Sequence, residues 1–373
     1  MKLKLEDVCE RGSSSLKQSD ILGMTGDYPI YGASGYIGNV DFYHQEKPYV
    51  AIVKDGAGIG RTTFHTAKSS VIGTMQYLLP KDNVLPKYLY YVVGHMHLEK
   101  YFSGATIPHI YFKDYKSEEF NYDSLDKQKN IVEILGRCEK VISARKRELE
   151  LLDSLIKARF VEMFGDPVFN PYGYDKVALS DLADIKVGPF GSLLHKEDYI
   201  EGGHPLLNPS HIVAGKISPD DKLTISDEKY EKLSAYQLKT GDVVMGRRGE
   251  MGRCAVVYED GLLCGTGSML IRTKGEVTAD YIQKIISFPS FKKTIEDMAV
   301  GQTMQNLNVP IVSGFQIIKP PMEVQDRYYA FVDQINKSKL LSLIKLLEQL
   351  ITYLYNVFII YRQDKGEEVE RHE

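Results

Sequence analysis

The sequence predicts an α+β protein made of two similar units, each a globule with a mixed sheet followed by one long helix. Three observations predict this fold class. A glycine-rich pattern occurs twice, at residues 50–79 and 242–271. Both copies consist mainly of short apolar runs that enter and leave a glycine turn, which is typical of strands. Each copy is followed by a helical pattern far longer than the average globular helix. Such a repeat indicates a duplicated, pseudo-two-fold architecture.

The repeat is defined by landmarks that keep their order in both copies. The matches are Gly60-Arg61 with Gly252-Arg253, Gly73-Thr74 with Gly265-Thr266, Asp27-Tyr-Pro29 with Gly203-His-Pro205, Gly104-Ala-Thr106 with Gly301-Gln-Thr303, and Leu125-Asp-Lys-Gln128 with Met322-Glu-Val-Gln325. Chance similarity between two loop-rich regions is the alternative, and the shared order disfavours it. We therefore expect equivalent elements in the two units.

Within each unit, apolar and β-branched runs predict short strands on both sides of the glycine turn. The expected strands are residues 49–53, 61–64, 242–245 and 253–258. Shorter helices are expected at residues 87–101 and 279–298.

Two long helices are expected at residues 126–163 and 323–361. Most apolar residues in the first recur in steps of four and three, as in a heptad seam in which only the Arg145 position is missing: Ile131, Leu135, Cys138, Ile142, Leu149, Leu152, Ile156, Phe160 and Met163. The seam expected in the second consists of Tyr328, Val332, Ile335, Leu340, Leu343, Leu347, Leu350, Leu354 and Phe358. A helix of about 38 residues is roughly 57 Å long. Because a single helix would leave its stripe in water, we expect the two to pair antiparallel as a coiled-coil spacer.

Composition argues for an ordinary globular protein of two or three domains. The 373 residues carry a formal net charge of −4, which disfavours a broadly basic nucleic-acid binder but permits local basic surfaces. The four cysteines show no CxxC spacing, as expected of reduced thiols in a cytoplasmic protein. No signal peptide is expected. Charged and amide residues interrupt the apolar stretch at 340–361, so an amphipathic helix is favoured over a membrane span.

The glycine turns have positively charged tips in both copies. The first carries Lys54 and Arg61, and the second carries Arg247, Arg248 and Arg253. Such side chains contact phosphates or read guanine edges. A solvated turn without specific function is the alternative, which recurrence in both units disfavours. A dinucleotide-binding loop at residues 56–60 is also disfavoured, because a strand pattern follows where that motif requires a helix.

A second pair of matching segments, residues 104–113 and 301–308, carries polar side chains. The candidates for DNA contact are Thr106, His109 and Lys113 in the first segment, and Gln302, Thr303, Gln305 and Asn306 in the second. Amide side chains can form paired hydrogen bonds with adenine. A polar loop that caps its own backbone is an equally good interpretation.

No catalytic or metal-binding pattern stands out. His95 and His97 lack a spaced third ligand. Asn170-Pro-Tyr172 lacks the second proline of the amino-methyltransferase motif that it faintly resembles. The sequence contains no P-loop and no GxSxG. We therefore expect no catalytic residue, no metal and no cofactor on this chain.

The order of motifs resembles the DNA-specificity subunit of type I restriction–modification systems. The resemblance is carried by Gln128-Lys-Asn-Ile131, by Phe160-Val-Glu-Met-Phe164-Gly-Asp-Pro167, and by the segment Tyr28-Pro-Ile-Tyr-Gly-Ala-Ser-Gly-Tyr-Ile-Gly38. It spans residues 1–361, although the second copy lacks Phe-Gly-Asp-Pro after Tyr361.

The resemblance implies target-recognition domains at residues 1–121 and 167–319, long helices at 122–166 and 320–363, and a polar, disordered tail at 364–373. Each globule would read one half of a bipartite, asymmetric site in double-stranded DNA. The paired helices would set the spacer and hold two methyltransferase subunits, to which restriction subunits can add. The methyltransferase would supply S-adenosylmethionine and base flipping. The alternatives are a tandem protein-interaction adaptor without DNA selectivity and a nucleotide-dependent enzyme.

Overall fold

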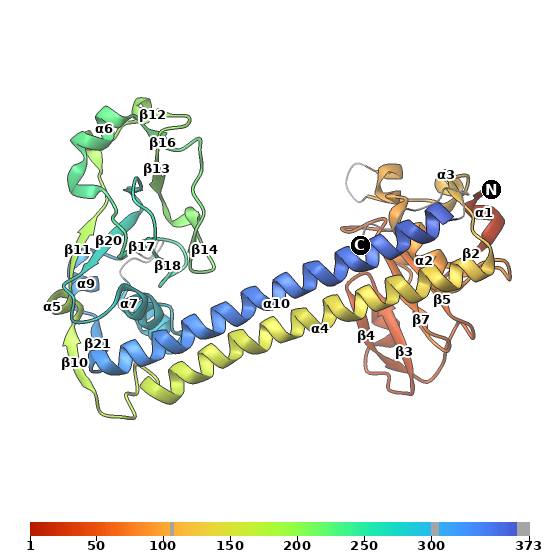
Figure 1. Cartoon of the computed structure of the whole chain (residues 1–373), viewed down its shortest axis with the longest axis horizontal. Helices are drawn as coiled ribbons and strands as arrows, with labels where there is room; N and C mark the ends of the chain where they lie inside the picture. Colours follow the sequence, from red (N-terminus) through yellow and green to blue (C-terminus); the bar gives the residue numbers. More distant parts are fainter. Residues whose placement is uncertain (105–107, 300–305, 364–373) are drawn as a thin grey trace. The chain divides into compact units, whose positions relative to one another are not determined.

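The computed structural model describes residues 1–104, 108–299 and 306–363, with the side chains of the last helix described as far as Tyr353. The chain forms two compact units (Figure 1). Unit 1 contains Met1–Lys146 and the C-terminal half of the last helix, from Leu343 on. Unit 2 contains Arg147–Ser342.

Unit 1 is built on an antiparallel four-stranded sheet of order β2-β8-β5-β6. The strands are β2 (Cys9–Ser13), β8 (Met75–Pro80), β5 (Tyr49–Val53) and β6 (Thr62–His65). A second sheet has the order β4-β3-β7, from Gly35–Val40, Tyr28–Gly32 and Ser70–Val71. A third pairs β1 (Lys2–Lys4) with β9 (Glu119–Asn121). The helices are α1 (Leu5–Val8), α2 (Pro86–His95) and α3 (Phe112–Tyr115).

The central strand β5 is apolar throughout because both of its faces are covered. Val50 and Ile52 pack in one cluster with α2, whereas Tyr49, Ala51 and Val53 pack in another cluster with β7 and β8. Successive side chains of a strand point to opposite faces. The continuous apolar run is therefore explained by burial on both sides.

Unit 2 repeats this plan with an antiparallel sheet of order β11-β20-β17-β18. These strands are β11 (Ala183–Val187), β20 (Ser268–Thr273), β17 (Asp242–Gly246) and β18 (Cys254–Val256). A second sheet, β12-β16-β13-β19, contains Tyr199–Ile200, Thr224–Ile225, His204–Leu207 and Leu263–Cys264. Two small pairs are β14 (Ile212–Val213) with β15 (Lys216–Ile217), and β10 (Asp175–Ala178) with β21 (Gln316–Lys319). The helices are α5 (Leu179–Leu182), α6 (Asp227–Lys232), α7 (Ala279–Ile286), α8 (Pro289–Met298) and α9 (Val309–Ser313).

The two units share their strand topology. The order β2-β8-β5-β6 in unit 1 is matched element by element by β11-β20-β17-β18 in unit 2. In each unit a parallel pair joins the second sheet, β3 with β7 and β13 with β19. The predicted α+β repeat is thereby confirmed at the level of backbone pairing.

The shorter helices differ from the prediction at their ends. The helix expected at 279–298 is interrupted between α7 and α8, at Ser287 and Phe288. Pro289 lacks an N–H, and its ring disfavours helical backbone at the preceding residue, so a new helix begins there. The helix expected at 87–101 ends at His95, and a separate 3₁₀ turn, η2, covers Leu98–Tyr101. His97 between them has a left-handed φ of 53°, which a continuous helix does not allow.

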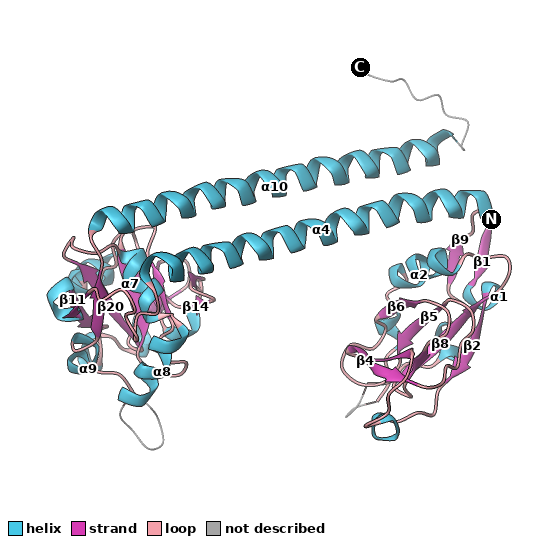
Figure 2. Cartoon of the chain, turned by 90° about the horizontal axis from the view of Figure 1, so that it is seen from below, coloured by secondary structure: helices cyan, strands magenta, loops and turns pink. Residues whose placement is uncertain are grey.

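The two long helices are α4 (Leu125–Phe164) and α10 (Met322–Gln363). At 1.5 Å per residue, the 40 residues of α4 extend over about 60 Å. Within unit 2 the helices pair antiparallel (Figure 2). The Tyr328 hydroxyl donates to the Ile156 carbonyl over 3.4 Å, and further along α10 the Ser342 hydroxyl donates to Glu148 over 3.0 Å. No helix in the described part of the chain has the length and apolarity that a membrane crossing requires.

The seam predicted on α4 is confirmed, since all of its members are partly or fully buried. The seam predicted on α10 is wrong at Leu340, Leu343 and Leu347, whereas Leu350 is partly buried as predicted. Leu340, Leu343 and Leu347 are exposed by 58%, 43% and 60%. The contacts with α4 are instead made by Lys339, which pairs with Asp153, and by the buried Ser342. Leu354 and Phe358 lie outside the described side chains.

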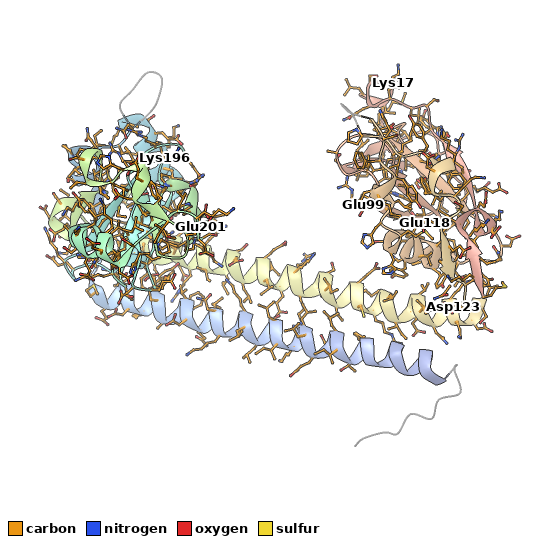
Figure 3. The ribbon with its side chains drawn as sticks, turned by 90° about the horizontal axis from the view of Figure 1, so that it is seen from above. Lys17, Glu99, Glu118, Asp123, Lys196 and Glu201 are labelled. Carbon is orange, nitrogen blue, oxygen red and sulfur yellow. The ribbon has the colours of Figure 1, made fainter. Side chains whose placement is uncertain are left out.

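One buried glutamine near the start of each long helix attaches that helix to its unit. In unit 1, Gln128 Oε1 accepts from the Leu85 N–H at 2.8 Å, and Gln128 Nε2 donates to the Asp123 carbonyl at 2.9 Å. Asp123 lies beside the start of α4 (Figure 3). In unit 2, Gln325 Oε1 accepts from the Thr278 N–H at 3.2 Å, and its Nε2 donates to the Pro320 carbonyl at 3.0 Å. The matched glutamines of the sequence therefore have the same structural role.

Replacing Gln325 with leucine is expected to destabilise the attachment of α10 by about 1–3 kcal/mol, because a buried N–H and a buried carbonyl lose their partner. Hydrogen exchange at the Thr278 amide measures the loss directly. Gln334→Leu on the exposed face of the same helix is the matched control. Equal protection of Thr278 in both variants would contradict this role.

Candidate nucleic-acid interface

The glycine turn of unit 1 is a hairpin that joins β5 to β6. The Gly60 N–H donates to the Val53 carbonyl, and the Val53 N–H donates to the Arg61 carbonyl, both over 2.9 Å. Gly60 has a φ of 80°, and a Cβ there would lie 2.6 Å from the backbone nitrogen of Glu99, so only glycine fits. Glu99 belongs to η2 and is labelled in Figure 3. Because β6 follows the turn directly, the helix that a dinucleotide-binding loop needs does not follow these glycines.

The glycine turn of unit 2 has the same construction with one residue fewer. The Gly246 N–H donates to the Arg253 carbonyl over 2.8 Å, as Val53 does to Arg61 in unit 1. Beyond the turn, unit 2 has one residue more between Arg253 and Gly265 than unit 1 has between Arg61 and Ile72. Gly265 donates to the carbonyl of its parallel neighbour, Leu207, as Ile72 does to Tyr31. The sequence match of Gly73 with Gly265 is therefore displaced by one position.

In each unit the turn is hydrogen-bonded to the second polar segment. The Lys54 carbonyl accepts from the Ile110 N–H, and the Arg247 carbonyl accepts from the Leu307 N–H, both at 2.9 Å. Isolated bridges pair Asp55 with His109 and Arg248 with Asn306. The structure thus brings together two segments that are far apart in sequence, and it makes Lys54 equivalent to Arg247. We call each pair of segments a turn–loop site.

The turn–loop site of unit 1 combines cations, a carboxylate and aromatic rings. Asp55 lies 3.4 Å from Lys54 Nζ and 2.7 Å from His109 Nδ1. The His109 ring stacks on Tyr111, and the ammonium of Lys113, on α3, lies 5.5 Å from the Tyr111 ring centre. Sequence reasoning missed Asp55 and Tyr111, although both lie inside the segments that it selected.

Arg61 is also part of this turn and is exposed. Its guanidinium lies close to Gly58, where an added Cβ would be 3.6 Å from Cζ. The side chain therefore remains available to a ligand at the surface of the turn.

The turn–loop site of unit 2 is richer in guanidinium groups. Arg247 Nε donates to Asn306 Oδ1 over 3.2 Å, and Arg248 beside it is exposed. Burial lowers the pKa of Arg247, and the neighbouring charge of Arg248 lowers it further. An anion such as a phosphate would offset the repulsion between these two cations.

Arg253 is not part of this group. It is held by Glu250 Oε2 at 2.9 Å and by the Pro209 carbonyl at 3.0 Å. Lys292 also binds Glu250, at 2.9 Å, and the two cations lower the pKa of that carboxyl. Glu250 partly offsets the charge of Arg253, so the structure assigns Arg253 a role in holding the turn.

The remaining sequence candidates, Thr106, Gln302, Thr303 and Gln305, lie outside the described residues. The described residues of the two sites supply mainly hydrogen-bond donors and positive charge, which suits phosphate oxygens and base edges. No group of three or more His, Cys, Asp or Glu side chains in the described part of the chain is placed to hold a metal ion.

Comparison with known proteins identifies the family. The family model described as "Type I restriction modification DNA specificity domain" matches residues 1–152 and 171–352. Two specificity subunits of type I restriction enzymes from Methanocaldococcus jannaschii are similar in sequence. MjaVIII is 21% identical over 298 residues, which are 74% of this chain and 69% of the relative. MjaIX is 23% identical over 300 residues, which are 72% of this chain and 67% of the relative.

Solved structures with a similar fold include the S subunit of a type I restriction–modification system from M. genitalium. Its TM-score is 0.61 and its sequence identity is 14%, with 95% of this chain and 93% of that chain covered. A structure from work on complex assembly and conformational transition of the type I R-M system has a TM-score of 0.54 and 14% identity, with 95% of both chains covered. These neighbours share the fold described above. Since the family model covers both units and most of the long helices, the chain belongs to the family of type I restriction–modification DNA-specificity subunits.

Proposed function

We propose that this chain is the non-catalytic subunit that gives a type I restriction–modification complex its DNA specificity. Each unit reads one half of a bipartite, asymmetric site in double-stranded DNA through its turn–loop site. The long helices set the distance between the half-sites and dock two methyltransferase subunits. Those partners bind S-adenosylmethionine and perform the base chemistry in the cytoplasm, and restriction subunits can join them.

The observation that carries this proposal is the recurrence of one backbone construction with different side chains. Lys54, Asp55 and His109 in unit 1 occupy the backbone positions of Arg247, Arg248 and Asn306 in unit 2. Two units that recognise different base sequences require the same backbone construction with different hydrogen-bond donors and acceptors. The reason is that base edges are distinguished by their donor and acceptor patterns.

The experiment that tests the proposal is methylome sequencing of cells that express this chain with and without its methyltransferase. We expect one asymmetric bipartite motif that appears only when both are present. The principal alternative, an adaptor that binds proteins alone, predicts a complex with the methyltransferase but no sequence motif. A motif that persists without this chain would exclude its role as the specificity subunit.

Replacing Arg247 and Arg248 together with alanine is expected to relax the half-site read by unit 2. Each contact of this kind contributes about 1–3 kcal/mol if it reaches a base, so we expect at least a tenfold loss of affinity for the correct site. Contacts to phosphate would instead weaken binding to all sequences and reduce its salt dependence. Fluorescence anisotropy of the assembled complex on DNA with either half-site changed distinguishes these cases.

Lys54→Ala in unit 1 serves as the matched control, because Lys54 has the backbone position of Arg247. This substitution should weaken recognition of only the half-site that unit 1 reads. Identical binding by the Arg247/Arg248 variant and the wild type would remove the unit 2 turn from the interface.

Partner docking is supported by an apolar stripe on α10 that faces away from the seam with α4. Leu340, Ile344, Leu347 and Ile351 follow one another in steps of four and three and are exposed by 58%, 42%, 60% and 65%. This spacing is the seam that a further helix uses for packing. We call these four residues the outer stripe, and we propose that a methyltransferase helix covers it.

Changing Leu347 and Ile351 to glutamate is expected to weaken assembly with the methyltransferase at least a hundredfold, since each buried leucine or isoleucine contributes about 1.5–3 kcal/mol. Size-exclusion chromatography with light scattering measures the loss of the complex. Lys345→Glu with Thr352→Glu is the control, because both side chains are exposed outside the outer stripe. If both double variants assemble equally, the outer stripe is not the docking surface.

A further inference from the structure

Unit 2 contains a cavity of about 760 Å³ next to its glycine turn. Its walls come from the end of α4, the β14–β15 hairpin, the turn before β18, and α7 and α8, which are labelled in Figure 2. Cavities of roughly 300–1,000 Å³ are typical of small-molecule sites. Neither the turn–loop site nor the outer stripe uses this space.

Positive charge predominates in the cavity. Lys157, Lys284, Lys292 and Arg253 line it, against the single carboxylate of Glu250. Glu250 is already shared between Lys292 and Arg253. The side-chain ammonium groups of Lys157 and Lys284 have no hydrogen-bond or ion-pair partner among the described residues, and Lys284 is half-buried. Burial lowers the pKa of Lys284, and the nearby charge of Lys157 lowers it further, with Asp153 partly opposing them. An anion placed between these two lysines would offset their repulsion.

The rest of the wall is apolar and partly aromatic. Phe160 and Val161 of α4, Ile212 of β14, and Phe288 with Pro289 at the start of α8 contribute to it. Inorganic phosphate would pair with the lysines but would make no contact with these apolar side chains. A flat ring joined to an anionic group uses both parts of the wall, because rings pack well against aromatic and apolar side chains.

Unit 1 has a smaller cavity, about 620 Å³, at the equivalent place beside Gly60, Arg61 and α2. That cavity contains Glu99 and Glu139 and has no lysine in its wall. The hollow is therefore a property of the repeated fold, whereas the cationic lining belongs to unit 2. A general surplus of basic residues does not explain it, since the whole chain has a net charge of −4.

We propose that the cavity of unit 2 binds a nucleoside phosphate, with the phosphate between Lys157 and Lys284 and the base against Phe288 and Pro289. The ligand is either a free nucleotide or a nucleotide of bound DNA. A bound phosphate also competes with Glu250 for Lys292. Occupancy would therefore loosen the contact that holds Arg253 and change the position of the unit 2 turn.

Isothermal titration calorimetry of the full chain with AMP, adenosine and inorganic phosphate tests the site. AMP should bind at least tenfold more tightly than either fragment, because only AMP uses both parts of the wall. Lys284→Met should weaken AMP binding about tenfold or more while leaving adenosine unchanged. Methionine retains the length and apolar body of the side chain, so the fold is expected to survive, and thermal unfolding checks this.

Lys293→Met is the matched control, since Lys293 is exposed on the same helix as Lys292 but does not line the cavity. Lys157→Glu, at an exposed position on α4, provides a second test of the same phosphate position. Equal binding of adenosine and AMP, unchanged AMP affinity in both cavity variants, or no binding of any probe would each overturn the proposal.

Competition identifies the source of the ligand. If a short DNA strand displaces AMP, and if the Lys284→Met variant does not bind that strand in the cavity, the site belongs to a nucleotide of DNA. Retention of AMP in the presence of saturating DNA would assign it to the free nucleotide. The site does not depend on the proposed reading of half-sites, because AMP binding is measured without the methyltransferase.

Discussion

Replacing Phe164 with alanine is expected to destabilise unit 2 by about 3–5 kcal/mol. Phe164 is the last residue of α4, and none of its side-chain surface is exposed. Its ring centre lies 4.9 Å from that of Phe160 and 5.3 Å from those of Tyr281 and Tyr328. The change would leave a cavity where α4, α7 and α10 meet, and it would remove three aromatic contacts.

Hydrogen-exchange mass spectrometry measures this effect locally, and the peptides of unit 1 provide an internal reference. Phe169→Ala is the matched control, because Phe169 lies five residues further along the chain and is 80% exposed. Its removal should change stability by less than about 0.5 kcal/mol. Comparable loss of protection in the two variants would show that the aromatic cluster does not stabilise unit 2.

The architecture of unit 2 around Phe164 was largely predictable from the sequence. The heptad seam of α4 is regular up to Phe160 and Met163, and the prolines after it set a limit on the helix. The sequence alone could not show why an aspartate, Asp166, follows the end of this helix. Asp166 Oδ1 accepts from the Val168 N–H at 2.8 Å and from the Ser290 hydroxyl at 2.9 Å. The second partner is 124 residues away and belongs to α8, so no local pattern reveals it.

The register of α10 could not be predicted, because leucines fill both of its faces. The prediction followed the most apolar residues and accepted a step of five from Ile335 to Leu340. The helix instead continues in steps of four and three through Lys339 and Ser342, which meet Asp153 and Glu148 of α4. Where the seam carries Lys339 and Ser342 while the opposite stripe is apolar, hydrophobic periodicity identifies the wrong face.

The turn–loop sites were predictable as segments but not as contacts. Recurrence identified the charged glycine turns and the polar loops separately. Their hydrogen bonds, such as Ile110 N–H to the Lys54 carbonyl, join residues more than fifty positions apart. The ion pair with Glu250 also distinguishes Arg253, which holds the turn, from Arg247 and Arg248. This distinction depends on side-chain geometry, which the amino-acid composition does not reveal.

Lengthening both long helices by one heptad is expected to lengthen the spacer of the recognised DNA motif, because the proposed function assigns the spacer to these helices. Seven residues add about 10 Å to a helix. A base pair adds about 3.4 Å to the duplex, so the spacer should grow by at most about three base pairs. We suggest duplicating residues 138–144 in α4 and residues 346–352 in α10, which lie opposite each other if the antiparallel pairing of Glu148 with Ser342 continues.

A whole heptad preserves the phase of both the seam and the outer stripe, whereas an insertion of five residues would turn the stripe by about 140°. The five-residue insertion should therefore abolish assembly, while the heptad insertion retains it and changes only the spacer. Methylome sequencing gives the spacer directly, and the two half-site sequences provide the control, because both units are unchanged. A longer spacer with the same half-sites would assign distance to the helices and sequence to the turn–loop sites. An unchanged spacer in an assembled, active complex would show that the helix length does not set the distance.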